Sequence, residues 1–170
     1  MKKFTQEYYD ILMEYIGLNQ RSIMLLSTTK YTGFVRWHNR NHEIYDNLNN
    51  KITKYISNMY GEYSTTKPIT TYNYAMPTNI ISHIDSWIGI LESMKNTSYE
   101  LYEMACNESD LVLAGYFKKL NKMVINEIFQ LKRLLKRFKD ATQTDISYVN
   151  KIIHDYFEKN KKCKWIDLSL

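Results

Sequence analysis

The chain has 170 residues, of which 44% are hydrophobic and 24% are charged, and its formal net charge is +5. A chain of this length and apolar content can bury one sizeable core, so we expect a single domain. It contains only two prolines and five glycines, which argues against a sheet protein with many tight turns and favours long helices.

The composition also disfavours membrane-spanning and disulfide-rich classes. No stretch approaches the roughly 18 consecutive apolar residues of a membrane span, and the first residues lack the apolar run of a signal peptide. The two cysteines, Cys106 and Cys163, lie in no CxxC or Cys/His metal pattern. We therefore expect a soluble, cytoplasmic protein with no membrane partner and no disulfide framework.

Hydrophobic residues recur at spacings of three and four along most of the chain, which is the period of an amphipathic helix. This pattern predicts a first long helix from Thr5 to about Thr29 and a second from His42 to Tyr60, which Gly61 is placed to end. Residues 63–78 carry two proline-marked breaks and are interpreted as a crossover segment.

The second half of the chain predicts three more helices. A third runs from Ser82 to Cys106, and a fourth, with a very regular period, runs from about Asp110 to Lys139. After a short turn, a last helix covers residues 146–157. Four long helices with a midpoint crossover and a short C-terminal helix describe an all-α four-helix bundle. We assign the bundle to residues 1–158, and a basic tail follows at residues 159–170.

The strongest candidate for a metal or acid/base site is the pair His42 and Asp46. The two residues are four apart, so they lie on one face of the predicted second helix. An alternative is that Asp46 is a first-turn acid favoured by the helix dipole, with His42 as a polar residue of the cap region. Another is a small histidine-rich site that joins His38 and Glu43 to the pair. Two ligands alone hold a metal poorly, which favours the first alternative.

Basic residues gather in the fourth helix and in the tail, and each set has two interpretations. In the helix they greatly outnumber the acids, because Glu127 is the only acid between Leu111 and Lys139. They form either a solvated face or a stripe that binds phosphates in a salt-dependent way. The tail lysines, which are next to Trp165, either increase solubility or bind a nucleic-acid backbone. The residues are Lys118, Lys119, Lys122, Lys132, Arg133, Lys136, Arg137 and Lys139 in the helix, and Lys159, Lys161, Lys162 and Lys164 in the tail.

Short motifs carry a resemblance to a known family. Two segments, residues 30–39 (KYTGFVRWHN) and residues 42–48 (HEIYDNL), together resemble the pattern of Dps proteins (DNA-binding protein from starved cells), a branch of the ferritin-like superfamily. In that pattern the first motif ends the first helix and the second motif opens the second helix. Residues 100–110 are similar to the end of the third helix and the following turn in Dps proteins and ferritins. The resemblance covers roughly residues 18–139 and implies a ferritin-like four-helix bundle.

The resemblance also implies a homo-oligomer, such as a dodecameric shell, with an iron-oxidising site shared between neighbouring subunits. His42 and Asp46 match the second histidine and the first aspartate of that site. The first histidine falls on Thr32, and the remaining carboxylates fall on Ser57 and Gly61, whose side chains cannot replace them as iron ligands.

Glu62 is the carboxylate nearest to the required register. A shift of one residue rotates a helical side chain by about 100 degrees, so Glu62 departs from the required face. The ferritin pattern is not met either, because the sequence has no Glu-x-x-His motif and a single acid in the fourth helix. Most of the iron ligands of both families are therefore missing.

The sequence thus predicts a shell-forming, Dps-like or ferritin-like protein that has lost iron oxidation and needs no cofactor. It would act by binding nucleic acid, DNA in particular, or another anionic partner. One alternative is a Dps-type ferroxidase and iron-storage protein with an altered ligand set of His42, Asp46 and Glu62, for which iron is the cofactor. A second alternative is a structural or adaptor bundle. Ordinary hydrolases and nucleotide enzymes are disfavoured, because the sequence lacks a glycine-rich phosphate loop, a Ser/His/Asp order and a zinc spacing.

Overall fold

The computed structural model describes residues 30–60, 79–141 and 145–160, except for the side chains of the last two, and every structural statement below concerns this part of the chain. The predicted first helix at Thr5–Thr29 and the predicted crossover lie outside these residues. So do Gly61, Glu62 and the side chains of the tail lysines.

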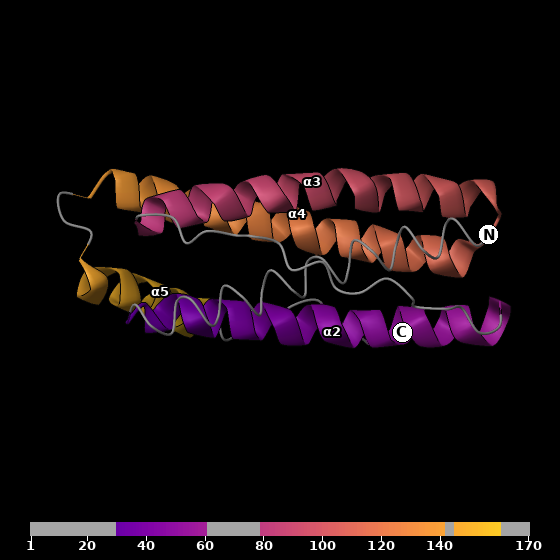
Figure 1. Ribbon diagram of the computed structural model, residues 1–170, viewed down its shortest axis with the longest axis horizontal. Helices are drawn as coiled ribbons and strands as arrows, with labels where there is room; N and C mark the ends of the chain where they lie inside the picture. The colour runs from indigo at the N-terminus through magenta and orange to yellow at the C-terminus, as the bar shows by residue number, and fades with distance from the viewer. Residues whose placement is uncertain (1–29, 61–78, 142–144, 161–170) are drawn as a thin grey trace.

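Four helices make up the described part of the chain, which contains no strand (Figure 1). They are α2 (Thr32–Tyr60), α3 (Ile80–Asn107), α4 (Leu111–Lys139) and α5 (Ile146–Asn160). The all-α class predicted from the sequence is confirmed for these residues, and the predicted third, fourth and last helices correspond to α3, α4 and α5. None of the four combines the length and the apolar character that crossing a lipid bilayer requires.

The prediction for the second helix was wrong at its start. The sequence pattern placed this start at His42, whereas α2 begins at Thr32 and continues to Tyr60. His38 and Asn41 have the character of loop residues in the sequence, but both are buried in α2. The helical period therefore continues through polar residues that the other helices shelter from water.

α5 packs along the first half of α2 (Figure 1). The ring of Trp37 lies against the rings of Tyr156 and Phe157, with centroid distances of 5.3 and 5.8 Å. At the start of α2, the backbone N–H of Gly33 donates to Asn150 Oδ1 at 2.9 Å, which satisfies a group that the first helical turn leaves without an intrahelical partner. A Cβ atom on Gly33 would lie only 3.3 Å from the same oxygen, so the absent side chain allows this close approach.

α2 and α3 run in the same direction, and α4 runs opposite to both (Figure 1). Near the starts of α2 and α3, Nε2 of His38 lies 3.1 Å from Nε2 of His83. At the other end, Tyr55 and Tyr60 of α2 donate hydrogen bonds to Asp110, which directly precedes α4. The 28 residues of α3 span about 40 Å. The chain between α2 and α3 therefore connects opposite ends of the helix array.

Asp110 fixes the turn between α3 and α4. Its side chain accepts hydrogen bonds from the backbone N–H of Leu113 at 2.9 Å, from the hydroxyl of Tyr55 at 2.9 Å and from the hydroxyl of Tyr60. Burial by itself raises the pKa of Asp110, but these hydrogen bonds outweigh burial and lower it. The bond to Asp110 in turn raises the pKa of Tyr60 to about 12. The N-cap of α4 thus also holds the end of α2.

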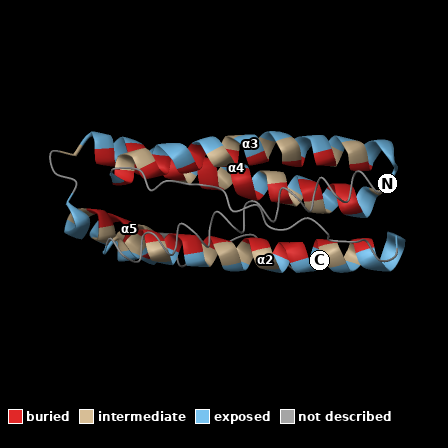
Figure 2. Ribbon diagram, viewed as in Figure 1, coloured by how far each residue is buried: buried red, intermediate tan, exposed pale blue. Residues whose placement is uncertain are grey.

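The core lies between the facing sides of the helices, where buried residues recur along each helix (Figure 2). Each large apolar side chain removed from water stabilises the fold by about 1.5–3 kcal/mol. The largest fully buried side chains are Trp37, Trp87, Phe34, Phe117, Phe138, Leu48, Ile52 and Ile56.

Candidate functional site

The predicted pair His42 and Asp46 lies four residues apart in α2, and both residues are half-buried. The interpretation of Asp46 as a first-turn acid was wrong, because α2 begins at Thr32 and its first turn holds no acid. Asp46 Oδ2 accepts a hydrogen bond from Asn50 Nδ2 at 3.3 Å. The ring nitrogen Nδ1 of His42 is buried and has no hydrogen-bond partner among the described residues.

The structure does not assemble a larger ligand set around this pair. In the described ranges, no group of three or more His, Cys, Asp or Glu side chains could hold a metal ion. His38 is buried against His83, whereas Glu43 is exposed, so the histidine-rich alternative is not assembled. Glu62 lies outside the described residues, and the ligand set that includes it stays a prediction.

A group of buried polar side chains, which the sequence analysis did not identify, lies between α2, α3 and α4. Its exposed fractions are 7% or less. The only sequence signal for it is Glu127, the sole acid of α4, which falls within the apolar series of that helix between Val124 and Leu131. We call the group the buried polar cluster, and it consists of His38, Asn41 and Tyr45 of α2, His83 and Trp87 of α3, and Glu127 of α4.

Glu127 is the acceptor at one end of the buried polar cluster. Its Oε1 accepts hydrogen bonds from Asn41 Nδ2 at 2.6 Å and from Trp87 Nε1 at 3.3 Å. Its Oε2 accepts a hydrogen bond from the hydroxyl of Tyr45 at 3.0 Å. Because both oxygens accept from protein donors on two other helices, the carboxyl group fixes the position of α4 against α2 and α3.

The two histidines form the other end of the cluster. Their Nε2 atoms lie 3.1 Å apart, so one ring donates and the other accepts. The ring of His38 also meets the ring of Trp87 edge to face, with a centroid distance of 4.6 Å. Burial lowers the pKa of His83 to about 4. The pKa of His38 is held well below 6.5, first by burial and second by the neighbouring His83. Both rings are therefore neutral at pH 7.

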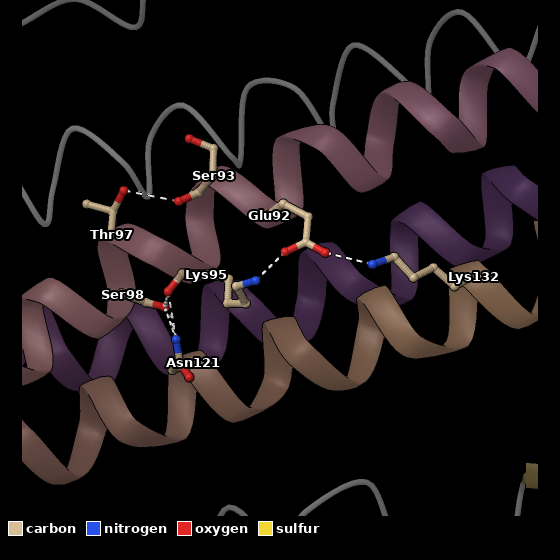
Figure 3. A network of polar contacts seen from close by, with 7 residues as sticks. All are labelled: Glu92, Ser93, Lys95, Thr97, Ser98, Asn121 and Lys132. Atoms are coloured by element: carbon tan, nitrogen blue, oxygen red, sulfur yellow. Dashed lines mark hydrogen bonds and ion pairs between the residues drawn. The ribbon is translucent and has the colours of Figure 1, made fainter.

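Lys132, one of the predicted basic residues of the fourth helix, lies opposite Glu92 of α3 (Figure 3). The carboxylate of Glu92 in α3 pairs with Lys95 of its own helix and with Lys132 of α4, the latter at 2.8 Å. The hydrogen bond from Lys132, followed by that from Lys95, lowers the pKa of Glu92 to about 2. Lys132 is thus held in place by an ion pair at the surface.

Arg133, Lys136 and Arg137 of this set are also exposed. The guanidinium of Arg133 lies over the ring of Phe129, 5.6 Å from its centroid. Lys136 and Arg137 belong to the last turn of α4, where the helix dipole favours cations. Since Glu127 is only 3% exposed, α4 presents no acidic side chain to solvent.

One line of exposed residues follows α4 at alternating spacings of four and three, which keeps it on a single face of the helix. Two apolar residues, Ile125 and Phe129, lie in its middle and are 47% and 59% exposed. We call this line the α4 stripe, and it consists of Lys118, Lys122, Ile125, Phe129, Lys132 and Lys136. It is the strongest candidate for a binding surface in the described part of the chain.

Comparison of the chain with protein-family models, with curated proteins and with solved structures finds no match. The assignment of a function therefore rests on the residues and contacts described above.

We expect Glu127→Ala to lower the free energy of unfolding by about 3 kcal/mol, because it removes the shared acceptor of three buried hydrogen bonds, from Asn41, Tyr45 and Trp87. Glu127→Gln keeps the shape and one carbonyl oxygen and should cost less. Urea unfolding monitored by circular dichroism measures both changes. Equal midpoints for Glu127→Ala and the unsubstituted chain would contradict the role given to Glu127.

The histidine pair predicts a loss of stability in mild acid. In the unfolded chain a histidine takes up a proton near pH 6.5, whereas folded His83 does so only near pH 4. Between these values the unfolded state binds more protons, so acidification from pH 6.5 to pH 4 lowers the free energy of unfolding, by about 3 kcal/mol for His83 alone. The variant His83→Gln should flatten this dependence in urea titrations at a series of pH values. An unchanged pH profile in that variant would exclude His83 as the cause.

Proposed function

We propose that this chain is a non-catalytic, ferritin-like helical bundle that forms a homo-oligomer and binds nucleic acid through the basic outer face of α4. The observation that carries the proposal is the charge of that face. The only acid of α4 is buried, whereas seven of its basic residues are exposed, namely Lys118, Lys122, Lys132, Arg133, Lys136, Arg137 and Lys139.

The topology supports the ferritin-like part of the proposal. α2 and α3 are parallel, so one long connection must join opposite ends of the array, and a single long crossover is typical of ferritin-like bundles. The Dps-like motif at residues 30–39 gives less support than the sequence suggested. Most of these residues lie in α2, whereas in the family pattern they end the preceding helix.

The charge on α4 supports an anionic partner with regularly spaced phosphates. From Lys118 to Lys136 the α4 stripe extends for about 27 Å along the helix axis. Each phosphate that a lysine or arginine neutralises releases condensed counterions, so binding weakens linearly on a log–log plot against salt. Two of the seven exposed basic residues are partly offset by α3, because Lys132 pairs with Glu92 and Lys139 lies 3.5 Å from Asp85.

The double variant Lys118→Glu with Lys122→Glu tests the proposed surface. If each lysine contacts a phosphate, the slope of log binding constant against log salt should become shallower by about 1.5, and affinity at low salt should fall at least tenfold. Fluorescence anisotropy with a short labelled DNA measures both quantities.

A matched control changes the net charge equally on other helices. Lys54 of α2 and Lys151 of α5 are both exposed, and the double variant Lys54→Glu with Lys151→Glu should leave the salt slope nearly unchanged. If both double variants weaken binding equally, net charge alone governs association and the α4 surface is not the site. If the unsubstituted chain binds no DNA at low salt, the proposed function is wrong.

A further inference from the structure

A hollow of about 420 Å³ opens between α3 and α4, beside the α4 stripe. This volume is within the range of small-molecule and cofactor sites. Two of its lining residues, Lys95 of α3 and Asn121 of α4, are labelled in Figure 3. The hollow is lined by Lys95, Asn96, Tyr99 and Glu100 of α3 and by Asn121 and Ile125 of α4.

Tyr99 and Ile125 line the hollow, and another exposed aromatic residue, Phe129, follows Ile125 on the α4 stripe. Tyr99 is 51% exposed, and Phe129 lies one helical turn beyond Ile125 on the α4 stripe. The ring of Tyr99 lies against the ring of Tyr102, with a centroid distance of 6.1 Å. Arg133 lies over Phe129. Two aromatic rings are thus restrained while much of their surface stays in contact with solvent.

The polar groups of the hollow suit an uncharged part of a ligand. Its lining holds one cation, Lys95, and one anion, Glu100, so it has no net charge. The two amino hydrogens of Asn121 are used within the protein, because Nδ2 donates to the backbone oxygen of Lys95 at 2.7 Å and to Ser98 Oγ at 2.9 Å. The amide of Asn96 is exposed and can donate and accept at the edge of a base.

The charges around the hollow argue against a second copy of this chain as the occupant. Packing α4 against α4 about a two-fold axis would place the same lysine-rich stripe on both partners. Like charges facing each other across an interface cost several kcal/mol. A duplex fits less well than a single strand, because its bases are stacked in its interior and it presents mainly phosphates to a helix face.

We propose that the hollow and the α4 stripe together bind single-stranded nucleic acid. Bases stack on Tyr99 and Phe129, and phosphates contact Lys118, Lys122 and Arg133. Positively charged tracks with exposed aromatic rings are the arrangement by which proteins hold single strands without reading their sequence. This inference rests on the proposed function and specifies that the nucleic acid is single-stranded.

Anisotropy titrations of the full chain with labelled oligothymidylate and with a duplex of equal length test the inference. The unsubstituted chain should bind the single strand more tightly than the duplex at the same salt. Phe129→Ala and Tyr99→Ala should each weaken single-strand binding about tenfold, with an unchanged salt slope and unchanged duplex binding. As a control, Leu111→Ala removes an apolar side chain of α4 that is 78% exposed and lies outside the hollow, and it should have no effect.

The outcomes separate this inference from the proposed function. If single strand and duplex bind equally and Phe129→Ala has no effect, the inference is wrong while the proposed function stands. If neither nucleic acid binds, both are wrong. If Phe129→Ala leaves single-strand affinity unchanged but lowers the molar mass measured by light scattering, this face is a contact between copies of the chain and the inference is overturned.

Discussion

The buried carboxyl group of Glu127 is the constraint on which the arrangement of α2, α3 and α4 depends. A carboxyl group is costly to remove from water unless donors replace the lost hydrogen bonds. Asn41, Tyr45 and Trp87 supply them from two other helices. The three helices must therefore keep a single register, because sliding α4 past its neighbours would separate the acceptor from all three donors.

The burial of Glu127 has a second consequence on the opposite side of α4. The helix has no other acid, so its outer face is left with lysine and arginine alone. The charges that partly offset it come from Glu92 and Asp85 of α3, at the margin of the α4 stripe. Glu127 thus contributes to the packing of the core. Because it is buried, its negative charge does not offset the positive charge of the outer face, which would attract a polyanion.

Much of the fold could be predicted from the sequence, because α3, α4 and α5 carry a clear apolar period. The start of α2 could not, because His38 and Asn41 are polar and their partners, His83 and Glu127, are more than forty residues away. The same long-range contacts make the buried polar cluster invisible to a periodicity analysis. The basic residues of α4 were recognised from the sequence, whereas no prediction was made for Phe129, which is 59% exposed.

The pair His42 and Asp46 shows the limit of a motif without its partners. Its spacing correctly placed both residues four apart on one helix, yet no third ligand joins them in the described part of the chain. We propose that nucleic acid binds at the α4 stripe, and ultraviolet cross-linking to oligothymidylate followed by peptide mass spectrometry tests this binding most directly. We predict cross-links at Tyr99 or Phe129. Cross-links confined to peptides of α2 or α5, or no cross-links at saturating oligonucleotide, would contradict binding at the α4 stripe.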